Sequence, residues 1–427
     1  MNIYISGISG TGMGPLALMA KSAGFSVFGS DLSEGAISRE LYNADIPFET
    51  GPNAQNGDFL QKCFDENGVD WFVYTSALPP NHPELVLAQK LGLRVSKRDE
   101  LIAFLVDKLG LNMVAVAGTH GKTTTTSMII WACLELDIPV SYLVGTTLPF
   151  AASGVYDTSS QFLIYEADEY DRNFLHFSPW LSVITVISYD HPDIYPTRED
   201  YQKAFRRFEG QSDRVVRISD EFPASDFQIS GAARREDASL AAQAVLMMAE
   251  EVGTTIPYEQ VIEVLNRFPG SGRRFERICS GVYSDYGHHP EEISATIDLA
   301  REEASRLGLK GVVAIYEPHQ NTRQHEVFDD YARAFDGVSH LYWLPTYLTR
   351  ENPELSIISP KEFISSLSPE VSQVAEPAEL DSTFGLELQK WRSEGYLILL
   401  LTAGPADAWL REVFAGMDDL VPENADE

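Results

Sequence analysis

The segment GTHGKT at positions 118–123 constrains the fold more than any other feature of the chain. It lies between an apolar run at 112–117, typical of a buried strand, and a helical pattern at 127–136. A glycine-rich turn between a strand and a helix presents backbone amides that, together with a lysine, can cradle phosphate groups. The general phosphate-loop pattern has a glycine where this chain has Val116, so the segment matches it except at one position. The segment therefore predicts an α/β domain that binds a nucleotide.

Apolar runs alternate with helical patterns along the rest of the chain, which predicts parallel sheets and the α/β class. The further strands are expected at 3–6, 25–29, 71–75, 162–165, 181–187, 282–284, 312–316, 340–344 and 396–401, and the further helices at 16–23, 100–108, 238–251 and 258–268. With 427 residues, 44% of them hydrophobic, the chain is long enough for two or three packed domains. The pattern restarts near residue 110 and again after residue 276.

Composition excludes several classes of protein. The 63 acidic and 32 basic residues give a net charge of −31, which repels nucleic acids and anionic membranes, so neither is an expected partner. The three cysteines lack metal-type spacing, which favours a reducing compartment without disulfides. The sequence starts without a basic leader and contains no run of about 18 apolar residues, so a soluble cytoplasmic protein is expected. Nothing in the sequence indicates an oligomeric state.

Acidic and imidazole side chains follow two of the expected strands. The segment EADE at 166–169 follows one apolar run, and DHPD at 190–193 follows the next. Ligands of open α/β sheets bind at the carboxyl ends of strands, so we expect two neighbouring strand ends to meet at one metal ion. Carboxylate and neutral imidazole both suit a divalent ion that carries phosphate, although magnesium usually prefers oxygen. Helix capping and a surface histidine are the alternative explanation.

Two later motifs carry positive or ionisable side chains. Arg273 and Arg274 are adjacent in the segment GRRFE, where they can neutralise a transferring phosphoryl group, although such pairs are often merely solvated. The segments DYGHHP at 285–290 and EPHQNTR at 317–323 together offer a pocket for the carboxylate of a small amino acid. Either histidine of the first segment can instead be structural.

The N-terminal segment GISGTGMG contains Gly7, Gly10, Gly12 and Gly14, and Asp31 follows the second expected strand. This arrangement suits a diphosphate with a ribose or base. By itself it fits a dinucleotide-dependent oxidoreductase equally well, but that reading leaves the lysine loop, the acidic strand ends and the paired arginines without a shared task.

Seven motifs taken in chain order resemble the landmarks of the Mur ligase family. They are GISGTGMG, YTSA, GTHGKTTTT, EADEYD, DHPDIY, GRRFE and DYGHHPEEI, and they span nearly the whole chain. The GTHGKT form, which lacks the general glycine, is the family's own variant. The resemblance implies three domains: a Rossmann-like UDP-sugar-binding domain at 1–108, a central P-loop ATPase-like domain at 109–276, and a C-terminal Rossmann-like amino-acid-binding domain at 277–427.

The resemblance also implies a reaction. The motifs are most similar to those of members that join L-alanine to the lactyl carboxylate of UDP-N-acetylmuramate in peptidoglycan biosynthesis, with ATP and Mg²⁺. The γ-phosphoryl group forms an acyl phosphate that the alanine amine attacks, so positioning and charge neutralisation supply most of the catalysis. One alternative is a ligase that recycles a wall tripeptide onto the same sugar, suggested by Glu317-Pro318 and by Gln320 where the family has an arginine. The other is a nucleotide-binding sensor that has lost the reaction.

The family's site residues carry over to matching positions of this chain. The implied ATP-binding residues are Gly118, Thr119, His120, Gly121, Lys122, Thr123, Thr124 and Asp285. The implied metal ligands are Thr123, Glu166 and His191, and the implied catalytic residues are Lys122, Glu166, His191, Arg273 and Arg274. The implied UDP-sugar contacts are Gly10, Thr11, Gly12, Asp31, Ser76, His120, Arg172, Asn173 and Phe174. The implied amino-acid contacts are His288, His289 and Arg323.

Overall fold

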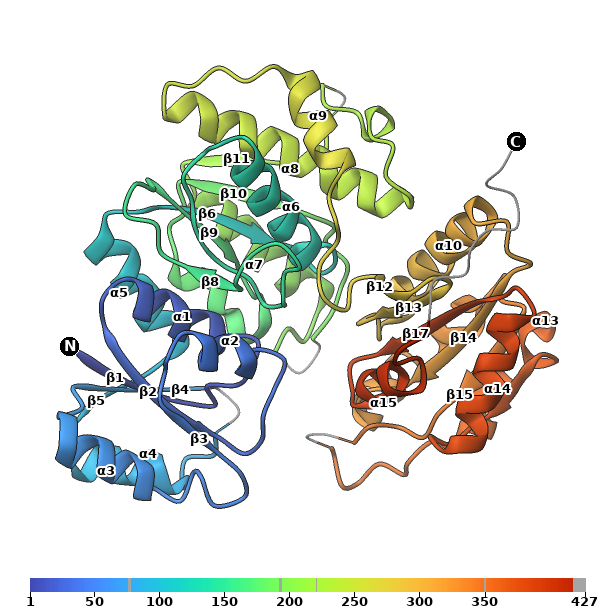
Figure 1. Cartoon of the computed structure of the whole chain (residues 1–427), viewed down its shortest axis with the longest axis horizontal. Coiled ribbons are helices and arrows are strands. Elements are labelled where there is room, and N and C mark those ends of the chain that lie inside the picture. The colour runs from blue at the N-terminus through green and yellow to red at the C-terminus, as the bar shows by residue number, and fades with distance from the viewer. Residues whose placement is uncertain (76–77, 192–193, 220, 349–350, 418–427) are drawn as a thin grey trace. The chain divides into compact units, whose positions relative to one another are not determined.

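The computed structural model describes residues 1–75, 78–191, 194–219, 221–348 and 351–417. It is an α/β protein with three sheets, which confirms the predicted fold class (Figure 1). The chain divides into two compact units. The first unit comprises residues 1–228 and 236–269 and holds two sheets, and the second comprises 229–235 and 270–427 and holds the third.

The first sheet is entirely parallel, with the order β3-β2-β1-β4-β5. Its strands are β1 (Asn2–Ser6), β2 (Ser26–Asp31), β3 (Phe48–Thr50), β4 (Trp71–Tyr74) and β5 (Arg94–Lys97). Its helices are α1 (Gly14–Ser22), α2 (Ser38–Asn43), α3 (Asp58–Asn67), α4 (Pro83–Lys90) and α5 (Arg98–Leu109). The chain reverses its direction of travel across the sheet between β1 and β4. The glycine-rich loop after β1 therefore lies at the topological switch point, where such sheets bind ligands.

The second sheet has the order β11-β10-β6-β9-β7-β8 and is parallel except between β7 and β8. Its strands are β6 (Asn112–Ala117), β7 (Ser141–Leu143), β8 (Gly154–Val155), β9 (Phe162–Glu166), β10 (Leu181–Ile184) and β11 (Arg214–Val216). Its helical segments are α6 (Lys122–Glu135), η1 (Tyr170–His176), α7 (Arg198–Gly210), η2 (Ala224–Asp226), α8 (Ala232–Glu251) and α9 (Tyr258–Asn266). The expectation that β9 and β10 are neighbours is wrong, because both pair with β6 and flank it.

The third sheet has the order β12-β13-β17-β14-β15-β16 and is parallel except between β12 and β13. Its strands are β12 (Glu276–Cys279), β13 (Val282–Asp285), β14 (Val312–Glu317), β15 (His340–Trp343), β16 (Ala375–Pro377) and β17 (Leu397–Thr402). Its helical segments are α10 (Pro290–Arg306), α11 (Asn321–Glu326), η3 (Phe328–Arg333), α12 (Pro360–Ser366), α13 (Pro369–Ser372), α14 (Ser382–Ser393) and α15 (Ala406–Val413). Alternate residues of β14 and β17 belong to two separate hydrophobic clusters. Helices therefore cover both faces, which explains the continuous apolar runs.

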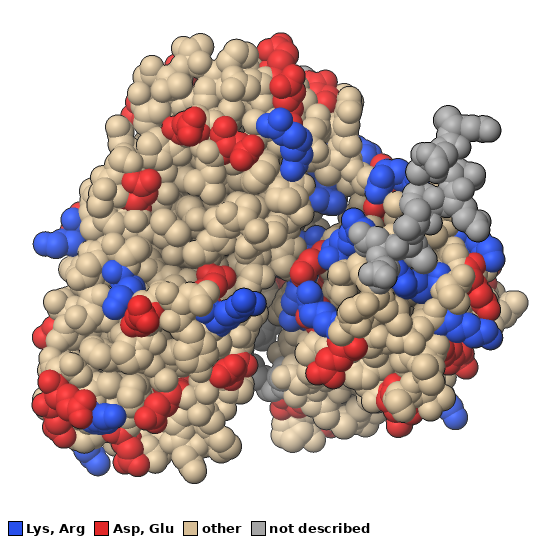
Figure 2. Space-filling view, in the orientation of Figure 1, with Lys and Arg blue, Asp and Glu red and all other residues tan. Residues whose placement is uncertain are grey.

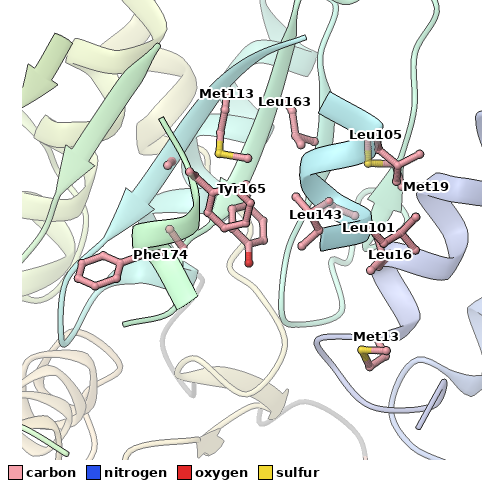
Figure 3. Packing of buried hydrophobic residues seen from close by; sticks show 14 of the residues in the cluster. Met13, Leu16, Met19, Leu101, Leu105, Met113, Leu143, Leu163, Tyr165 and Phe174 are labelled. Atoms are coloured by element: carbon pink, nitrogen blue, oxygen red, sulfur yellow. The ribbon is translucent and has the colours of Figure 1, made fainter. Parts of the chain in front are cut away.

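One hydrophobic cluster joins the two sheets of the first unit (Figure 3). It contains Met19 of α1 and Leu105 of α5 from the first sheet's layer, together with Leu163 and Tyr165 of β9. Helices α1 and α5 thus contribute to a core that continues past residue 108. The sheets change at that point of the chain, but the packing does not break.

The sequence pattern misplaces or omits several elements. Helix α6 begins at Lys122, directly after the glycine loop and not at residue 127, because its first turns bury the threonines at 123, 125 and 126 and so lack apolar periodicity. Strand β10 ends at Ile184, three residues before the expected end of the apolar run. The short strands β3, β7, β8, β11 and β16 have two or three residues each, too few to leave an alternating pattern.

Charged side chains are dispersed on the surface. On the face drawn in Figure 2, acidic and basic groups are interspersed and do not gather into one patch. Within the described ranges, no helix combines the length and the apolar character needed to cross a membrane.

The shared core yields a stability prediction. Leu101 of α5 is fully buried in this cluster, so Leu101→Ala leaves a cavity and should lower the free energy of unfolding of the first unit by about 2–4 kcal/mol. Urea unfolding followed by tryptophan fluorescence measures it, because Trp71 belongs to the same cluster. Leu134→Ala, at a helical leucine that is 41% exposed, is the control and should change stability by less than about 0.5 kcal/mol. Equal effects of the two variants would contradict a continuous core.

Candidate functional site

The loop between β6 and α6 depends on glycine. Gly118 and Gly121 have φ angles of 151° and 84°, which side chains rarely adopt. A Cβ atom at Gly121 would also collide with the carboxylate of Asp237, which accepts a hydrogen bond of 2.9 Å from the hydroxyl of Thr125. Asp237 therefore holds the first turn of α6 from a distant part of the sequence. The sequence patterns do not single out this residue.

Lys122 is buried at the start of α6. Its Nζ donates to the carbonyls of Gly118 (2.6 Å) and Thr119 (3.0 Å) and lies 2.9 Å from Oε2 of Glu169. Burial alone would lower the pKa of Lys122, but the charges of Glu169 and Asp168 outweigh it and raise that pKa. Burial alone would raise the pKa of Glu169, but Lys122 and His191 lower it. Both groups are therefore ionised. Glu169 belongs to the acidic motif that the sequence indicates, although the family resemblance assigned only Glu166 to the site.

Two oxygen ligands meet at the ends of β6 and β9. The hydroxyl of Thr123 donates to Oε1 of Glu166 at 2.8 Å, and the amide of Gly145 donates to Oε2 at 3.2 Å. A hydroxyl and a carboxylate together suit a hard divalent cation. This pair of oxygens fits the expected magnesium site.

His191 is the third expected metal ligand. Its Nε2 lies 3.6 Å from Oε1 of Glu169 and 3.6 Å from Oδ2 of Asp190. The carboxylate brought next to His191 is thus Glu169, whereas Glu166 is held by Thr123. Pro192 and Asp193, which follow in the same motif, lie outside the described residues.

Thr119 connects the loop to the chain that follows β10. Its hydroxyl donates to the carbonyl of Ser188 (2.6 Å) and accepts from the Ser188 amide (2.9 Å), and the hydroxyl of Tyr201 lies 2.7 Å away. The side chain of Thr119 is therefore occupied by structural bonds, and its amide donates to the carbonyl of Val186 at 2.7 Å, so Thr119 shapes the loop. These bonds place the His191 segment beside the phosphate loop.

The glycine-rich loop after β1 is accessible. Gly10 and Thr11 are exposed, and Gly12 is half-buried. Asp31 accepts hydrogen bonds from the amides of Ser9 (2.9 Å) and Leu32 (2.7 Å), and burial raises the pKa of Asp31. Asp31 thus fastens the loop to the end of β2.

The remaining expected sugar contacts differ in exposure. Arg172 has a left-handed backbone and its guanidinium lies over the ring of Tyr195, 5.4 Å from the centroid. Phe174 is fully buried and packs against Phe205, so its side chain belongs to the core and offers no surface to a ligand. Ser76 lies outside the described residues.

In the second unit, the paired arginines belong to a turn fastened to strand ends. Nη2 of Arg273 donates to the carbonyl of Thr402 at 2.6 Å, and both Arg273 and Arg274 lie over the ring of Tyr286. Asp285 accepts from the amides of Phe275 and Gly287, each at 2.7 Å, and burial raises its pKa. The Asp285 carboxylate therefore secures the turn.

His288 and Arg323 form the other polar group of the second unit. Burial lowers the pKa of His288 to about 3, with the charges of Arg323 and His319 acting in the same direction and Glu292 opposing. His288 is therefore neutral at physiological pH. The Arg323 guanidinium has no hydrogen bond or ion pair with any residue in the described ranges, so it is available to an anion. His289 accepts from the amide of Glu291 at 3.4 Å and caps α10.

Comparisons with known proteins identify the family of the chain. The family described as "Mur ligase family, catalytic domain" matches residues 2–108, and the "Mur ligase middle domain" matches residues 116–229. The UDP-N-acetylmuramate–L-alanine ligase of Sorangium cellulosum is 30% identical over 99% of this chain and 97% of its own length. The solved UDP-N-acetylmuramate–alanine ligase of Thermotoga maritima shares the fold with a TM-score of 0.74 and 23% identity, covering 97% and 98% of the two chains. A murein peptide ligase of Psychrobacter arcticus gives a TM-score of 0.62 and 21% identity, covering 99% of each chain.

The chain therefore belongs to the Mur ligase family. It is an ATP-dependent ligase of peptidoglycan biosynthesis, as the ordered motifs predicted.

The neutral state of His288 predicts a pH dependence. Between pH 6.5 and about 3 the unfolded chain binds a proton at this residue and the folded chain does not, so its contribution to stability falls as the pH drops through that window. His288→Gln should therefore lose less stability than the wild type between about pH 7 and about pH 5, measured by urea unfolding. In the native protein the imidazole NMR signal of His288 should stay neutral over the same range, with the urea-unfolded chain as control. An imidazole that titrates near its ordinary pKa would refute the buried neutral assignment.

Proposed function

We propose that the chain joins L-alanine to the lactyl carboxylate of UDP-N-acetylmuramate with consumption of ATP, and that it does so in the cytoplasm. The observation that carries the proposal is the position of Lys122, on a glycine loop between two strand ends that bear carboxylates and a histidine. A full-length relative named for that reaction, at 30% identity, supports the choice of amino acid. We assign sugar-nucleotide binding to residues 1–108, ATP binding to 109–276 and amino-acid binding to 277–427.

In this proposal the first unit carries the phosphoryl transfer. Lys122 and the loop at 118–121 would hold the ATP phosphates, with Thr124 beside them. Thr123 and Glu166 would hold magnesium, with His191 nearby. When bound there, magnesium would supply positive charge against the negative charge that phosphate and carboxylate bring together. Transfer of the γ-phosphoryl group to the lactyl oxygen leaves ADP, and attack by the alanine amine then expels inorganic phosphate. Arg273 and Arg274 are proposed to act on the same charge, and Asp285 to lie near the ATP ribose.

His288 and Arg323 are proposed to bind the amino acid. The guanidinium of Arg323, which pairs with no residue in the described ranges, suits the carboxylate of alanine. Because its pKa is about 3, His288 is a poor proton acceptor at neutral pH, so we assign it to hydrogen bonding with the substrate and not to general base catalysis. Its neighbour His289 caps α10, and we propose that it contributes to amino-acid binding by holding that end of the helix in place.

A second candidate is ligation of a wall tripeptide to the same sugar. Gln320 stands where the family resemblance places an arginine, and it has a φ angle of 63° at the start of α11. Glutamine lacks the positive charge of an arginine, so the carboxylate of a free amino acid is bound more weakly at that point. The acceptor assay below separates the two reactions.

The first test is phosphate release with ATP, magnesium and UDP-N-acetylmuramate. L-Alanine, glycine, L-serine and the tripeptide are compared as acceptors. We expect release that depends on L-alanine, with mass spectrometry showing the ligated product. Preference for the tripeptide would establish the recycling reaction, and no turnover with any acceptor would favour a nucleotide sensor.

Lys122→Ala should abolish ligation, with a loss of at least about 10³-fold in turnover, because the phosphates lose their buried cation. The measurement is the same phosphate assay, and circular dichroism verifies folding. Lys62→Ala, at an exposed lysine of α3, is the control and should keep the wild-type rate. Turnover near normal in Lys122→Ala would remove Lys122 from the reaction.

His191→Ala should raise the magnesium concentration needed for half-maximal turnover by about tenfold or more. The reason is that the proposed metal site loses an imidazole that binds the ion or orients the groups that do. Magnesium titrations at saturating ATP measure the change. An unaltered magnesium dependence would mean that His191 serves only its contacts with Glu169 and Asp190.

A further inference from the structure

Arg98 is an arginine of the first unit whose side chain forms no hydrogen bond with any described residue. It is the first residue of α5, and its side chain is 24% exposed. Its nearest charged group is Oδ2 of Asp168, at 3.6 Å, which is too long for a hydrogen bond. The guanidinium donates no hydrogen bond to any residue in the described ranges. A guanidinium carries five N–H donors. Those of Arg98 are not among the buried polar atoms without a partner in the described ranges, so they are accessible to water and to a ligand.

The same guanidinium lies against the glycine-rich loop. A Cβ atom at Gly12 would collide with Nη1 of Arg98. Gly12 is not among the residues with a positive φ angle, so its backbone conformation does not require glycine. The guanidinium of Arg98 fills the space beside Gly12, so a side chain at this position would displace it. The guanidinium thus lies against the loop, next in sequence to the exposed residues Gly10 and Thr11.

Arg98 also lies at the junction of the two sheets of the first unit. Asp168 follows β9 and is adjacent to Glu169, the partner of Lys122. The interactions with Tyr165 and Asp168 raise the pKa of Arg98 against the effect of burial. An arginine is protonated at every physiological pH. Asp168 orients the guanidinium from one side and leaves the loop side to another acceptor.

We propose that Arg98 binds the diphosphate of the sugar nucleotide at the glycine-rich loop and is a substrate-binding residue outside the motifs that the sequence singles out. The proposal rests on the proposed function. Backbone amides of the loop supply neutral donors, and Arg98 supplies the positive charge and the forked geometry that suit phosphate oxygens. The alternative anion on the same substrate is the lactyl carboxylate.

Binding of two ligands without ATP separates these sources. UDP-N-acetylmuramate carries both anions, whereas UDP-N-acetylglucosamine carries only the diphosphate. In calorimetric titrations Arg98→Gln should weaken both ligands to a similar degree, by about ten- to a hundredfold. Arg98→Lys should recover part of the loss, and the affinity of the wild type should fall more steeply with salt than that of Arg98→Gln. Gly12→Ala, which retains the arginine but displaces it, should show the same loss for both ligands.

Arg94→Gln is the matched control. Arg94 lies four residues earlier, over the ring of Trp71 and with half of its side chain exposed, and its loss should change either affinity by less than about twofold. Thermal unfolding verifies that Arg98→Gln remains folded.

Two results overturn the assignment. Unchanged affinity of Arg98→Gln for both ligands would reduce Arg98 to a structural partner of Asp168, and a loss confined to UDP-N-acetylmuramate would place it on the lactyl carboxylate. If the wild type binds neither ligand, the proposed function fails and the role of Arg98 fails with it.

Discussion

The ion pair between Lys122 and Glu169 is the interaction on which the site depends. A buried ammonium group without partners would cost several kcal/mol, and here it is held by two loop carbonyls and one carboxylate. Glu169 is itself fixed, because its carbonyl accepts a hydrogen bond of 2.6 Å from the hydroxyl of Tyr195 and its carboxylate faces His191. The pair therefore connects the segments that follow β6, β9 and β10. Parallel pairing brings these strand ends to one edge, and the ion pair makes that edge a single site.

The strand and loop around Lys122 could be predicted almost to the residue. Strand β6 has the expected bounds, because a buried parallel strand leaves a continuous apolar run and glycine terminates it. The acidic motif could be located but not resolved. It offers three carboxylates within four residues, and spacing cannot tell which one faces the lysine after β9 ends. Asp237 and Arg98 could not be predicted for a different reason. Asp237 contacts Gly121 and Arg98 contacts Gly12, and these contacts exist only in the folded chain.

Backbone strain marks the same motifs. Of the non-glycine residues with positive φ in the described ranges, six lie in segments that the sequence singled out: Asp171, Arg172, His191, Arg273, Phe275 and Gln320. Each such conformation costs about 1–3 kcal/mol and persists only where neighbouring contacts enforce it. His191 is enforced by two amides that donate to its carbonyl, at 2.9 and 3.0 Å, and Arg273 by the carboxylate of Glu276, which accepts from its amide at 2.8 Å. In such backbone conformations a side chain points in a direction that regular strands and helices do not allow. Residue spacing alone therefore cannot predict where these side chains lie.

The division of the hydrophobic cores separates two kinds of chemistry. One hydrophobic cluster, to which α1 and α5 contribute, underlies three features: the glycine loop after β1, Arg98 and the phosphate loop after β6. Their relative positions are therefore set by one packed core. The residues around His288 and Arg323 stand on the clusters of the third sheet, within the other compact unit. A substitution such as Gln320 therefore alters the pocket proposed for the amino acid without disturbing the packing that positions Lys122. This separation gives a physical reason why ligases of one fold can differ in the acceptor they use while retaining the same loop for ATP.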